Sequence, residues 1–309
     1  MIYFNLSAHQ NIIDEHYTKL EPYLLKKIDE STINKNLKDF LKNNLEKIIT
    51  AKPIELIKLH KDFTSNTSYN SASNKKVKKI FNYKYFSSKS DNGGYDGYEL
   101  AKNLAVRTCL YCNRNYTLTV MKGNKTAGKF TRPEFDHFFD KGVHPLLALS
   151  IYNLIPSCKI CNSSLKGRTK FSLNSYLHPF LDDVINFYNF GYKPHDVKSI
   201  LGGSSNLEIE IKIDSGDRKL DKKIEKTKDV FRLEEIFSAH SEELKDLFEI
   251  RHRYSQKYLV ELFKKYEKLG LKYNEVYKTA FGVNFLESEF SKRPFSKLKK
   301  DILEHLKII

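Results

Sequence analysis

The sequence has few cysteines, no long apolar run, and no basic-then-apolar segment among its first residues. Only 4 cysteines occur in 309 residues, which argues against a small secreted protein that depends on disulfide bonds. No apolar stretch approaches the roughly 18 residues that a membrane-spanning helix requires. The opening residues, MIYFNLSAHQ, lack the layout of a secretory signal. We therefore expect a soluble, cytoplasmic protein and not a membrane, secreted or fibrous one.

The excess of positive charge is concentrated in one quarter of the chain. Lys and Arg total 53 against 38 acidic residues, which gives a net charge of +15. Residues 101–175 contain 12 basic and 3 acidic residues, whereas residues 1–100 contain 16 and 12, and residues 176–309 contain 25 and 23. A basic surface attracts polyanions. The composition therefore favours a polyanionic partner, with residues 101–175 as the part of the chain that meets it.

The pattern of apolar residues divides the chain into three parts. Residues 1–95 are expected to form a helical N-terminal region that ends in a basic loop, because apolar residues recur at intervals of three and four up to residue 62. Residues 96–175 are expected to form a compact centre of helices and strands. Residues 176–309 are mixed at first and then mainly helical. The predicted class is therefore α+β, with helical regions on both sides of the centre.

Two strands are predicted outside this centre. The stretch from Thr64 to Gly94 has the composition of a loop, but its aromatic segment KIFNYKYF is compatible with a short strand. Residues 207–214, LEIEIKID, alternate apolar and polar side chains as a half-buried strand does.

The four cysteines form two pairs with the same spacing. Cys109-Leu-Tyr-Cys112 and Cys158-Lys-Ile-Cys161 each have two residues between the thiols, a spacing that lets a tight turn direct two thiolates at one ion. Four thiolates make a closed tetrahedral site of the structural zinc type. Redox dithiols are an alternative, but two of them would be unusual; buried small side chains are another, but they do not explain the repeated spacing. We therefore expect one structural zinc ion.

The segment between the cysteine pairs contains residues suited to bind a metal and to accept a proton. If Glu134-Phe-Asp136-His137 is a strand, Glu134 and Asp136 share one face, and His137 faces the other way unless the strand ends there. Aspartate offers a hard oxygen for Mg²⁺, and histidine offers an imidazole that accepts a proton from water. An Asp-His pair at the end of a strand therefore places two complementary groups side by side.

Four motifs occur in an order that resembles the HNH nuclease family. They are the pair Asp136-His137, the pair Asn153-Leu154, which begins 16 residues after His137, the sequence C-x-x-C-Asn that ends at Asn162, and Lys166 four residues later. Cysteine-bracketed members of the family are a close match, and the resemblance covers about residues 105–170. It implies a ββα-metal core, in which two antiparallel strands, a loop and a helix surround one divalent cation.

The resemblance also implies a role for each motif residue. His137 matches the general base that activates the attacking water, and Asp136 and Asn162 match the two protein ligands of a catalytic Mg²⁺ or Mn²⁺. Asn153 matches the residue that holds the loop carrying the base, and Lys166 matches a basic position near the scissile phosphate. Glu134 is expected to hydrogen-bond to a ligand and not to bind the metal itself. Four cysteines leave no open position on a zinc ion, so the zinc is expected to support the fold.

The function implied by the resemblance is metal-dependent endonuclease cleavage of nucleic acid, with DNA favoured over RNA or tRNA. Zinc-bracketed proteins of this length resemble nuclease subunits of bacterial anti-phage systems such as Septu, which work beside an ATPase partner. The sequence has no glycine loop that cradles phosphates, so any ATP chemistry would need that partner. The alternatives are a zinc-stapled module that binds nucleic acid without cutting it, and a scaffold that contacts only protein. Asp136, His137 and Asn162 favour the nuclease, because a binding module has no need of all three.

Several charged residues outside the motif need an interpretation. Residues 74–86, NKKVKKIFNYKYF, contain five lysines among aromatic rings and no acidic residue. Such a stretch can bind phosphates and stack on bases, but a solvated basic loop beside an aromatic core fits equally well. The triplet Asp14-Glu15-His16 lies on an expected amphipathic helix, where we expect it to be solvated. Six cations are candidates for the groove around the site: Arg107, Arg114, Lys122, Lys125, Lys129 and Arg132.

Overall fold

The computed structural model describes residues 1–66, 69–88, 94–123 and 126–309. In this part of the chain the protein is mainly helical, with three antiparallel sheets of two strands each. The α+β class expected from the sequence is confirmed. Within the same residues, no helix has the length and apolar character needed to cross a membrane.

The chain divides into two compact units. The N-terminal unit comprises Phe4–Val106 and Thr117–Asp182, and the C-terminal unit comprises Met1–Tyr3, Arg107–Tyr116 and Asp183–Ile309. The three segments expected from the sequence, 1–95, 96–175 and 176–309, do not each form a unit of their own. The reason is that the helices near the N-terminus pack against the segment that carries the motif, as described below.

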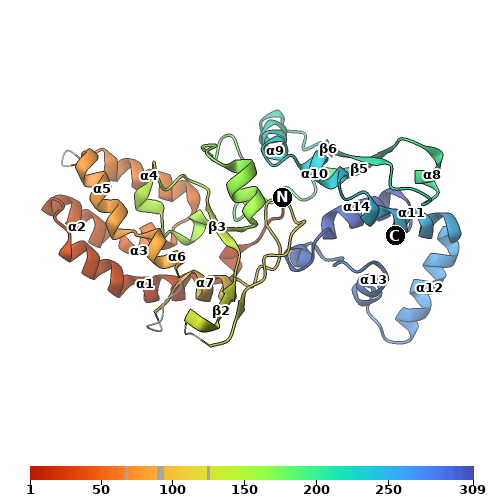
Figure 1. The fold of residues 1–309 in the computed structure, drawn as a ribbon, viewed down its shortest axis with the longest axis horizontal. Coiled ribbons are helices and arrows are strands. Elements are labelled where there is room, and N and C mark those ends of the chain that lie inside the picture. The colour runs from red at the N-terminus through yellow and green to blue at the C-terminus, as the bar shows by residue number, and fades with distance from the viewer. Residues whose placement is uncertain (67–68, 89–93, 124–125) are drawn as a thin grey trace. The chain divides into compact units, whose positions relative to one another are not determined.

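The N-terminal unit contains the helices and strands drawn from red to green in Figure 1. Its helices are α1 (Gln10–Glu30), α2 (Lys35–Asn43), α3 (Leu45–Thr50), α4 (Pro53–Thr64), α5 (Ser71–Ile80), α6 (Tyr83–Ser87) and α7 (Gly97–Leu104). Its strands are β1 (Val120–Met121), β2 (Lys129–Thr131), β3 (Glu134–His137) and β4 (Leu154–Ser157). Its short turns are η1 (Leu6–Ala8), η2 (Thr126–Gly128), η3 (Pro145–Leu147), η4 (Ile151–Asn153) and the π-helical turn η5 (Ile160–Lys166).

The amphipathic pattern explains the helices that were expected over residues 1–62. In α1 the buried side chains recur at intervals of three and four residues and face one side of the helix: Ile12, Ile13, His16, Leu20, Leu24 and Ile28. The same periodicity buries Leu37 and Leu41 in α2. The helical prediction for this region is confirmed.

The aromatic stretch KIFNYKYF is helical, so the prediction of a strand is wrong. Helix α5 ends at Ile80, and α6 begins at Tyr83. The side chain of Asn82 accepts a hydrogen bond from the backbone N–H of Tyr85 at 3.1 Å. A capping asparagine satisfies an N–H group that the first turn of a helix leaves without a partner, and this cap starts α6. The loop expected from Thr64 to Gly94 is also wrong over Ser71–Ile80, which form α5, and residues 67–68 and 89–93 of that stretch lie outside the described residues.

The loop between β3 and β4 is buried over most of its length, although loops usually lie on the surface; residues 141–143 are exposed. The two strands are antiparallel, with Glu134 opposite Ser157 and His137 opposite Leu154. Between them, residues 138–153 form the turns η3 and η4, which pack against α3, α4 and α5. Six apolar side chains of this loop are at most 2% exposed: Phe138, Phe139, Leu146, Leu147, Leu149 and Ile151. The N-terminal helices therefore hold the loop that follows His137.

The C-terminal unit is built on one long hairpin. Strand β5 (Tyr188–Pro194) pairs with β6 (Leu207–Ile213), with Tyr188 opposite Ile213 and Pro194 opposite Leu207, which confirms the strand predicted at residues 207–214. Helix α10 packs on β6, and α14 packs on β5. The helices of this unit are α8 (Val197–Ile200), α9 (Arg218–Val230), α10 (Leu233–Ser238), α11 (Glu242–Arg253), α12 (Gln256–Lys268), α13 (Tyr273–Phe281) and α14 (Ser296–His305), with the 3₁₀ turn η6 (Glu287–Lys292).

Candidate active site and cysteine cluster

The four cysteines meet, as their spacing predicts. All four side chains are buried, and their sulfur atoms lie within 4.8 Å of one another. In each pair, the residue after the second cysteine donates its N–H to the carbonyl of the first: Asn113 to Cys109 at 2.8 Å and Asn162 to Cys158 at 3.0 Å. Four thiolates about 2.3 Å from one ion are about 3.8 Å apart. The cluster therefore has the composition and the size to hold a metal such as zinc.

The motif residues gather in a second place, a pocket of about 530 Å³ in the N-terminal unit. Strand β3 supplies Glu134, Asp136 and His137, and η5 supplies Asn162 and Lys166. His137, the last residue of β3, lines this pocket together with Glu134 and Asp136. The order of elements is strand, loop, strand and helical turn. Residues nearly 30 positions apart are thereby brought together.

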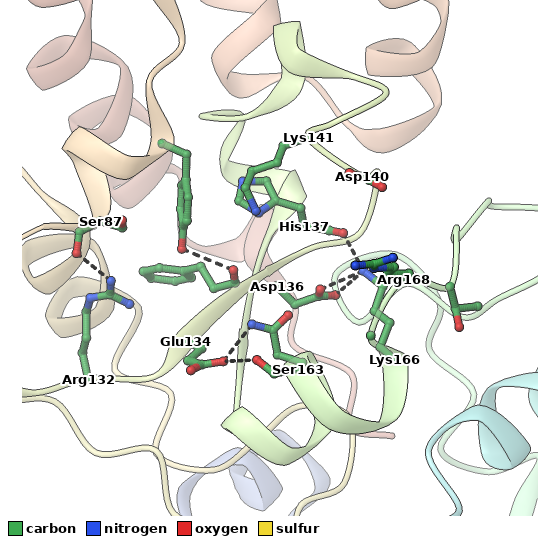
Figure 2. Close-up of a pocket in the computed structure, with 15 residues that line it drawn as sticks. Ser87, Arg132, Glu134, Asp136, His137, Asp140, Lys141, Ser163, Lys166 and Arg168 are labelled. Carbon is green, nitrogen blue, oxygen red and sulfur yellow. Dashed lines mark hydrogen bonds and ion pairs between the residues drawn. The ribbon is translucent and has the colours of Figure 1, made fainter. Parts of the chain in front are cut away.

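Lys166 binds Asp136. Its Nζ lies 2.7 and 2.8 Å from the two carboxylate oxygens of Asp136 and 2.5 Å from the carbonyl oxygen of His137 (Figure 2). Both side chains are 5% exposed. Burial lowers the pKa of Lys166, and the neighbouring carboxylate opposes that effect. Without a metal ion, Lys166 therefore balances the charge of the proposed metal ligand.

The hydrogen bonds of His137 determine which of its nitrogens can accept a proton. Its Nε2 lies 3.0 Å from the carbonyl oxygen of Ala148, and a carbonyl can only accept, so Nε2 carries the hydrogen. In the neutral ring, Nδ1 then has the available lone pair. Burial, together with the charge of Lys141, lowers the pKa of His137 to about 3. The imidazole is therefore neutral at physiological pH, with its free lone pair at Nδ1.

Asn153 holds the buried loop. Its side-chain oxygen accepts a hydrogen bond from the N–H of Phe139 at 2.7 Å, and its amide nitrogen donates to the carbonyls of Phe139 at 3.1 Å and Leu147 at 2.9 Å. The side chain is fully buried. Three hydrogen bonds from one residue join both ends and the middle of the loop. This is the arrangement that a loop-holding residue requires.

Asn162 and Glu134 form a pair beside Asp136. The amide nitrogen of Asn162 donates to Oε2 of Glu134 at 2.8 Å, and the hydroxyl of Ser163 donates to the same oxygen at 3.3 Å. Because the amide nitrogen is held by Glu134, the amide oxygen of Asn162 remains available as a ligand. Carboxylate and amide oxygens are the hard donors that Mg²⁺ prefers. The donor set of Asp136 and Asn162 therefore fits a magnesium ion.

Two residues near His137 have roles that the sequence did not indicate. His16 was expected to be solvated, but it is fully buried, and its Nε2 donates to the carbonyl of Leu149 at 2.8 Å. It supports the residue next to Ala148, the partner of His137. Tyr83 places its ring 4.3 Å from the His137 ring, edge to face. The burial of His16 was detectable, because position 16 falls on the same face of α1 as Ile12 and Leu20, whereas Tyr83 was marked only as one ring of the basic stretch 74–86.

Of the six cations expected around the site, one lines the pocket. Arg132 lies there, and its guanidinium donates to the carbonyls of Ser87 at 2.8 Å and Pro133 at 2.6 Å. Lys129 is buried against Asp96 at 2.6 Å, so it does not face a substrate. Lys122 is exposed outside the lining, and Lys125 lies outside the described residues. The other two, Arg107 and Arg114, belong to the C-terminal unit.

Comparison with known proteins assigns the chain to no family. No family model, no curated protein and no solved structure matches it. The function proposed below therefore depends on the order of the motifs and on the geometry of the pocket.

Proposed function

We propose that the protein is a metal-dependent endonuclease of the HNH type, which hydrolyses phosphodiester bonds in nucleic acid. One observation carries the proposal: Asp136, His137, Asn162 and Lys166 line a single pocket. They come from β3 and η5, and β4, which pairs with β3, lies between these two elements in the chain; strand, strand and helical turn is the order of a ββα-metal core. The cysteine cluster would be the site of the structural zinc.

The charges of the pocket support an anionic substrate. Arg132, Lys141 and Arg168 line it beside the acidic and amide side chains, and cations of this kind bind phosphate oxygens. DNA is the favoured substrate and RNA, including tRNA, the second. Action in the cytoplasm, in anti-phage defence and beside an ATPase partner, is proposed on the family resemblance alone.

The residues of the pocket divide the chemistry between them. Nδ1 of His137 would take the proton of the attacking water, while Ala148 holds the ring in the required tautomer. Asn153 would keep the loop in place, and Glu134 would hold the amide of Asn162 in its ligand orientation. A divalent cation bound by Asp136 and Asn162 would supply Lewis-acid stabilisation of the phosphate and the leaving oxygen.

The test is a cleavage assay with plasmid, single-stranded DNA and total RNA in the presence of Mg²⁺ or Mn²⁺. The parent protein should cut at least one of these substrates. The substitution His137→Ala should lower the rate roughly 100- to 10,000-fold, the usual contribution of a general base, and should leave binding largely intact. His195→Ala, which changes an exposed histidine of the C-terminal unit, is the matched control and should cut like the parent. Equal cutting by the His137 variant would show that the catalytic assignment is wrong.

The alternative, a module that binds nucleic acid without cutting it, is favoured by one specific observation. Both carboxylate oxygens of Asp136 accept hydrogen bonds from Lys166, which would suit a pocket that holds no metal. The same assay separates the two functions. Binding without cleavage in every arm, with either metal, would support the module and contradict the nuclease.

A further inference from the structure

A second hollow adjoins the candidate active site. It has a volume of about 280 Å³, and Tyr83 and Lys141 line both this hollow and the active-site pocket. Ala148, whose carbonyl holds His137, also lines it. We call it the lysine hollow, because Lys78, Lys84 and Lys141 form its charged lining. One residue, Ala148, therefore both lines the hollow and contacts the proposed general base.

The lining of the lysine hollow has charge of one sign. Its three lysines come from α5, from α6 and from the loop after β3, and no acidic residue joins them. All three side chains are exposed, and none forms an ion pair within the part of the chain that the structure describes. Their ammonium groups are therefore available to an anion from outside the protein.

A second hollow beside α5 is also lined by three lysines, but two of its lysines have partners within the protein. That hollow is lined by Lys27, Lys76 and Lys79, but also by Glu30. Lys27 is paired with Glu30 at 2.8 Å, and Lys76 donates to the carbonyl of Thr32 at 2.7 Å. Two of those three lysines are thus engaged by acceptors of the protein itself. Neighbouring lysines of one helix face two different environments.

Lys141 connects the lysine hollow with the active-site pocket. Its Nζ lies 5.3 Å from the centre of the Tyr83 ring, within the range of a cation–π contact. The same ring packs against the ring of His137 at nearly a right angle, and Figure 2 shows Lys141 beside His137, while Asp136 faces Lys166. A chain of phosphates that passes His137 would therefore meet Lys141 and then the other two lysines.

We propose that the lysine hollow binds backbone phosphates of the substrate next to the bond that is cut. The ligand is a polynucleotide, recognised through its phosphodiester charge by Lys78, Lys84 and Lys141. This inference rests on the proposed function, because it assigns the path of the same substrate. The ligand class follows from a row of unpaired cations without a carboxylate, which binds phosphates irrespective of base sequence.

The test measures how salt weakens binding, in the His137→Ala background so that the probe stays intact. The probes are a fluorescent single-stranded DNA, an RNA of the same sequence and the DNA duplex. Each lost phosphate contact reduces the slope of log affinity against log salt by about 0.7 for a single strand and about 0.9 for a duplex. The double substitution Lys78→Gln/Lys84→Gln should therefore flatten the slope by about 1.4 on single strands and about 1.8 on the duplex.

The matched control is Lys75→Gln/Lys79→Gln, which removes the same charge from exposed positions of α5 outside the hollow. It should keep the parent slope on every probe. Equal slopes for the two double variants would overturn the inference, since a general loss of charge would then explain the effect. Between the DNA strand and the RNA strand of the same sequence, for which the same change is expected, the larger change in slope identifies DNA or RNA as the ligand.

A second assay separates failure of this inference from failure of the proposed function. Hydrolysis of bis(4-nitrophenyl) phosphate, which has no flanking phosphates, should be unchanged by Lys78→Gln/Lys84→Gln in the otherwise unmodified protein. Cleavage of a long strand by that variant should fall at the same time. If both substrates are cut at the parent rate, the lysine hollow plays no part and the nuclease stands. If the parent neither binds nor cuts, both proposals are wrong.

Discussion

The ammonium group of Lys166 competes with any cation for Asp136. It donates to both carboxylate oxygens and to the carbonyl of His137, and it is almost fully buried. Removal of one member of a buried ion pair destabilises a protein by about 3–5 kcal/mol, because the other charge is left without compensation. Lys166 therefore keeps the folded protein stable when no metal is bound, and we expect a metal ion that binds Asp136 to displace it.

This competition predicts the behaviour of Lys166→Met. Without added metal, the free energy of unfolding should fall by about 3 kcal/mol. Added Mg²⁺ should then raise the melting temperature more in the variant than in the parent, because a ligand that binds only the folded state stabilises it more, the tighter it binds at a given concentration. Thermal melts across a magnesium titration measure both effects.

The double variant Asp136→Asn/Lys166→Met is the control. It has no carboxylate at position 136, so it should regain part of the lost stability and should respond little to Mg²⁺. A magnesium effect of the same size in the parent and in both variants would place the ion elsewhere on the molecule.

At the scale of single residues, the spacing of the motifs predicted which side chains gather in one pocket, but it did not predict the hydrogen bonds that they form there. The order of motifs placed Asp136, His137 and Asn162 together, since a hairpin followed by a helical turn returns the chain to its starting strand. The pairing of Lys166 with Asp136 was not predicted, because it depends on how deeply η5 buries its last residue. The burial of His16 was not predicted. Its neighbours Asp14 and Glu15 indicated a solvated face, but His16 lies on the apolar face of α1 together with Leu20.

At the scale of elements, α1 and β3 hold the same short piece of loop. His16 of α1 donates to the carbonyl of Leu149, and His137 of β3 donates to the carbonyl of Ala148. Nδ1 of His16 lies 3.0 Å from the hydroxyl of Tyr95, which donates to it when Nε2 carries the ring hydrogen. Helix α1 therefore contributes to the position of the proposed base through two neighbouring carbonyls.

This contact predicts a dependence of stability on pH. Burial lowers the pKa of His16 from 6.5 to about 4, so between those values the unfolded chain binds a proton that the folded chain does not. The contribution of neutral His16 to the free energy of unfolding is therefore fully present above pH 6.5 and is lost as the pH falls towards 4. At about 1.4 kcal/mol for each pKa unit, the total loss attributable to His16 is about 3 kcal/mol.

Urea unfolding of the parent and of His16→Gln over this pH range isolates the contribution. Glutamine retains a donor but does not titrate, so the difference in unfolding free energy between the two proteins should shrink as the pH falls. His60 and His137 also have lowered pKa values, but both remain in the variant. A difference that is constant with pH would show that His16 does not titrate as described.

The elements themselves were predictable where one signal dominated. Amphipathic periodicity identified residues 1–62 as helical without separating α2 from α3, and strict alternation identified β6. The aromatic stretch after α5 was ambiguous because β-favouring rings compete with the cap at Asn82, and the cap prevailed. The strands β3 and β4 are four residues long and buried at almost every position, so alternation could not reveal them; only the motif pointed to them.

At the scale of the whole molecule, the units could not be predicted because they are not continuous in sequence. The N–H of Ile2 donates to the carbonyl of Leu110 at 2.7 Å, and the N–H of Thr108 donates to the carbonyl of Ser291 at 3.0 Å. The hydroxyl of Tyr188 donates to the carbonyl of Met1 at 2.8 Å. Such pairings join segments more than 100 positions apart, and no local pattern encodes them.

The cysteine cluster makes a prediction for the intact chain. Zinc bound by four thiolates contributes directly to folding, and the sulfur atoms are close enough to share one ion. Elemental analysis of the purified, untreated protein should therefore find one zinc per chain. Cys158→Ser should lower the zinc content and the melting temperature together. Asp136→Asn should keep its zinc, because the proposed magnesium ligands belong to a different site. A folded parent with much less than one zinc per chain would contradict the assignment, and loss of zinc from Asp136→Asn would show that the two sites are not independent.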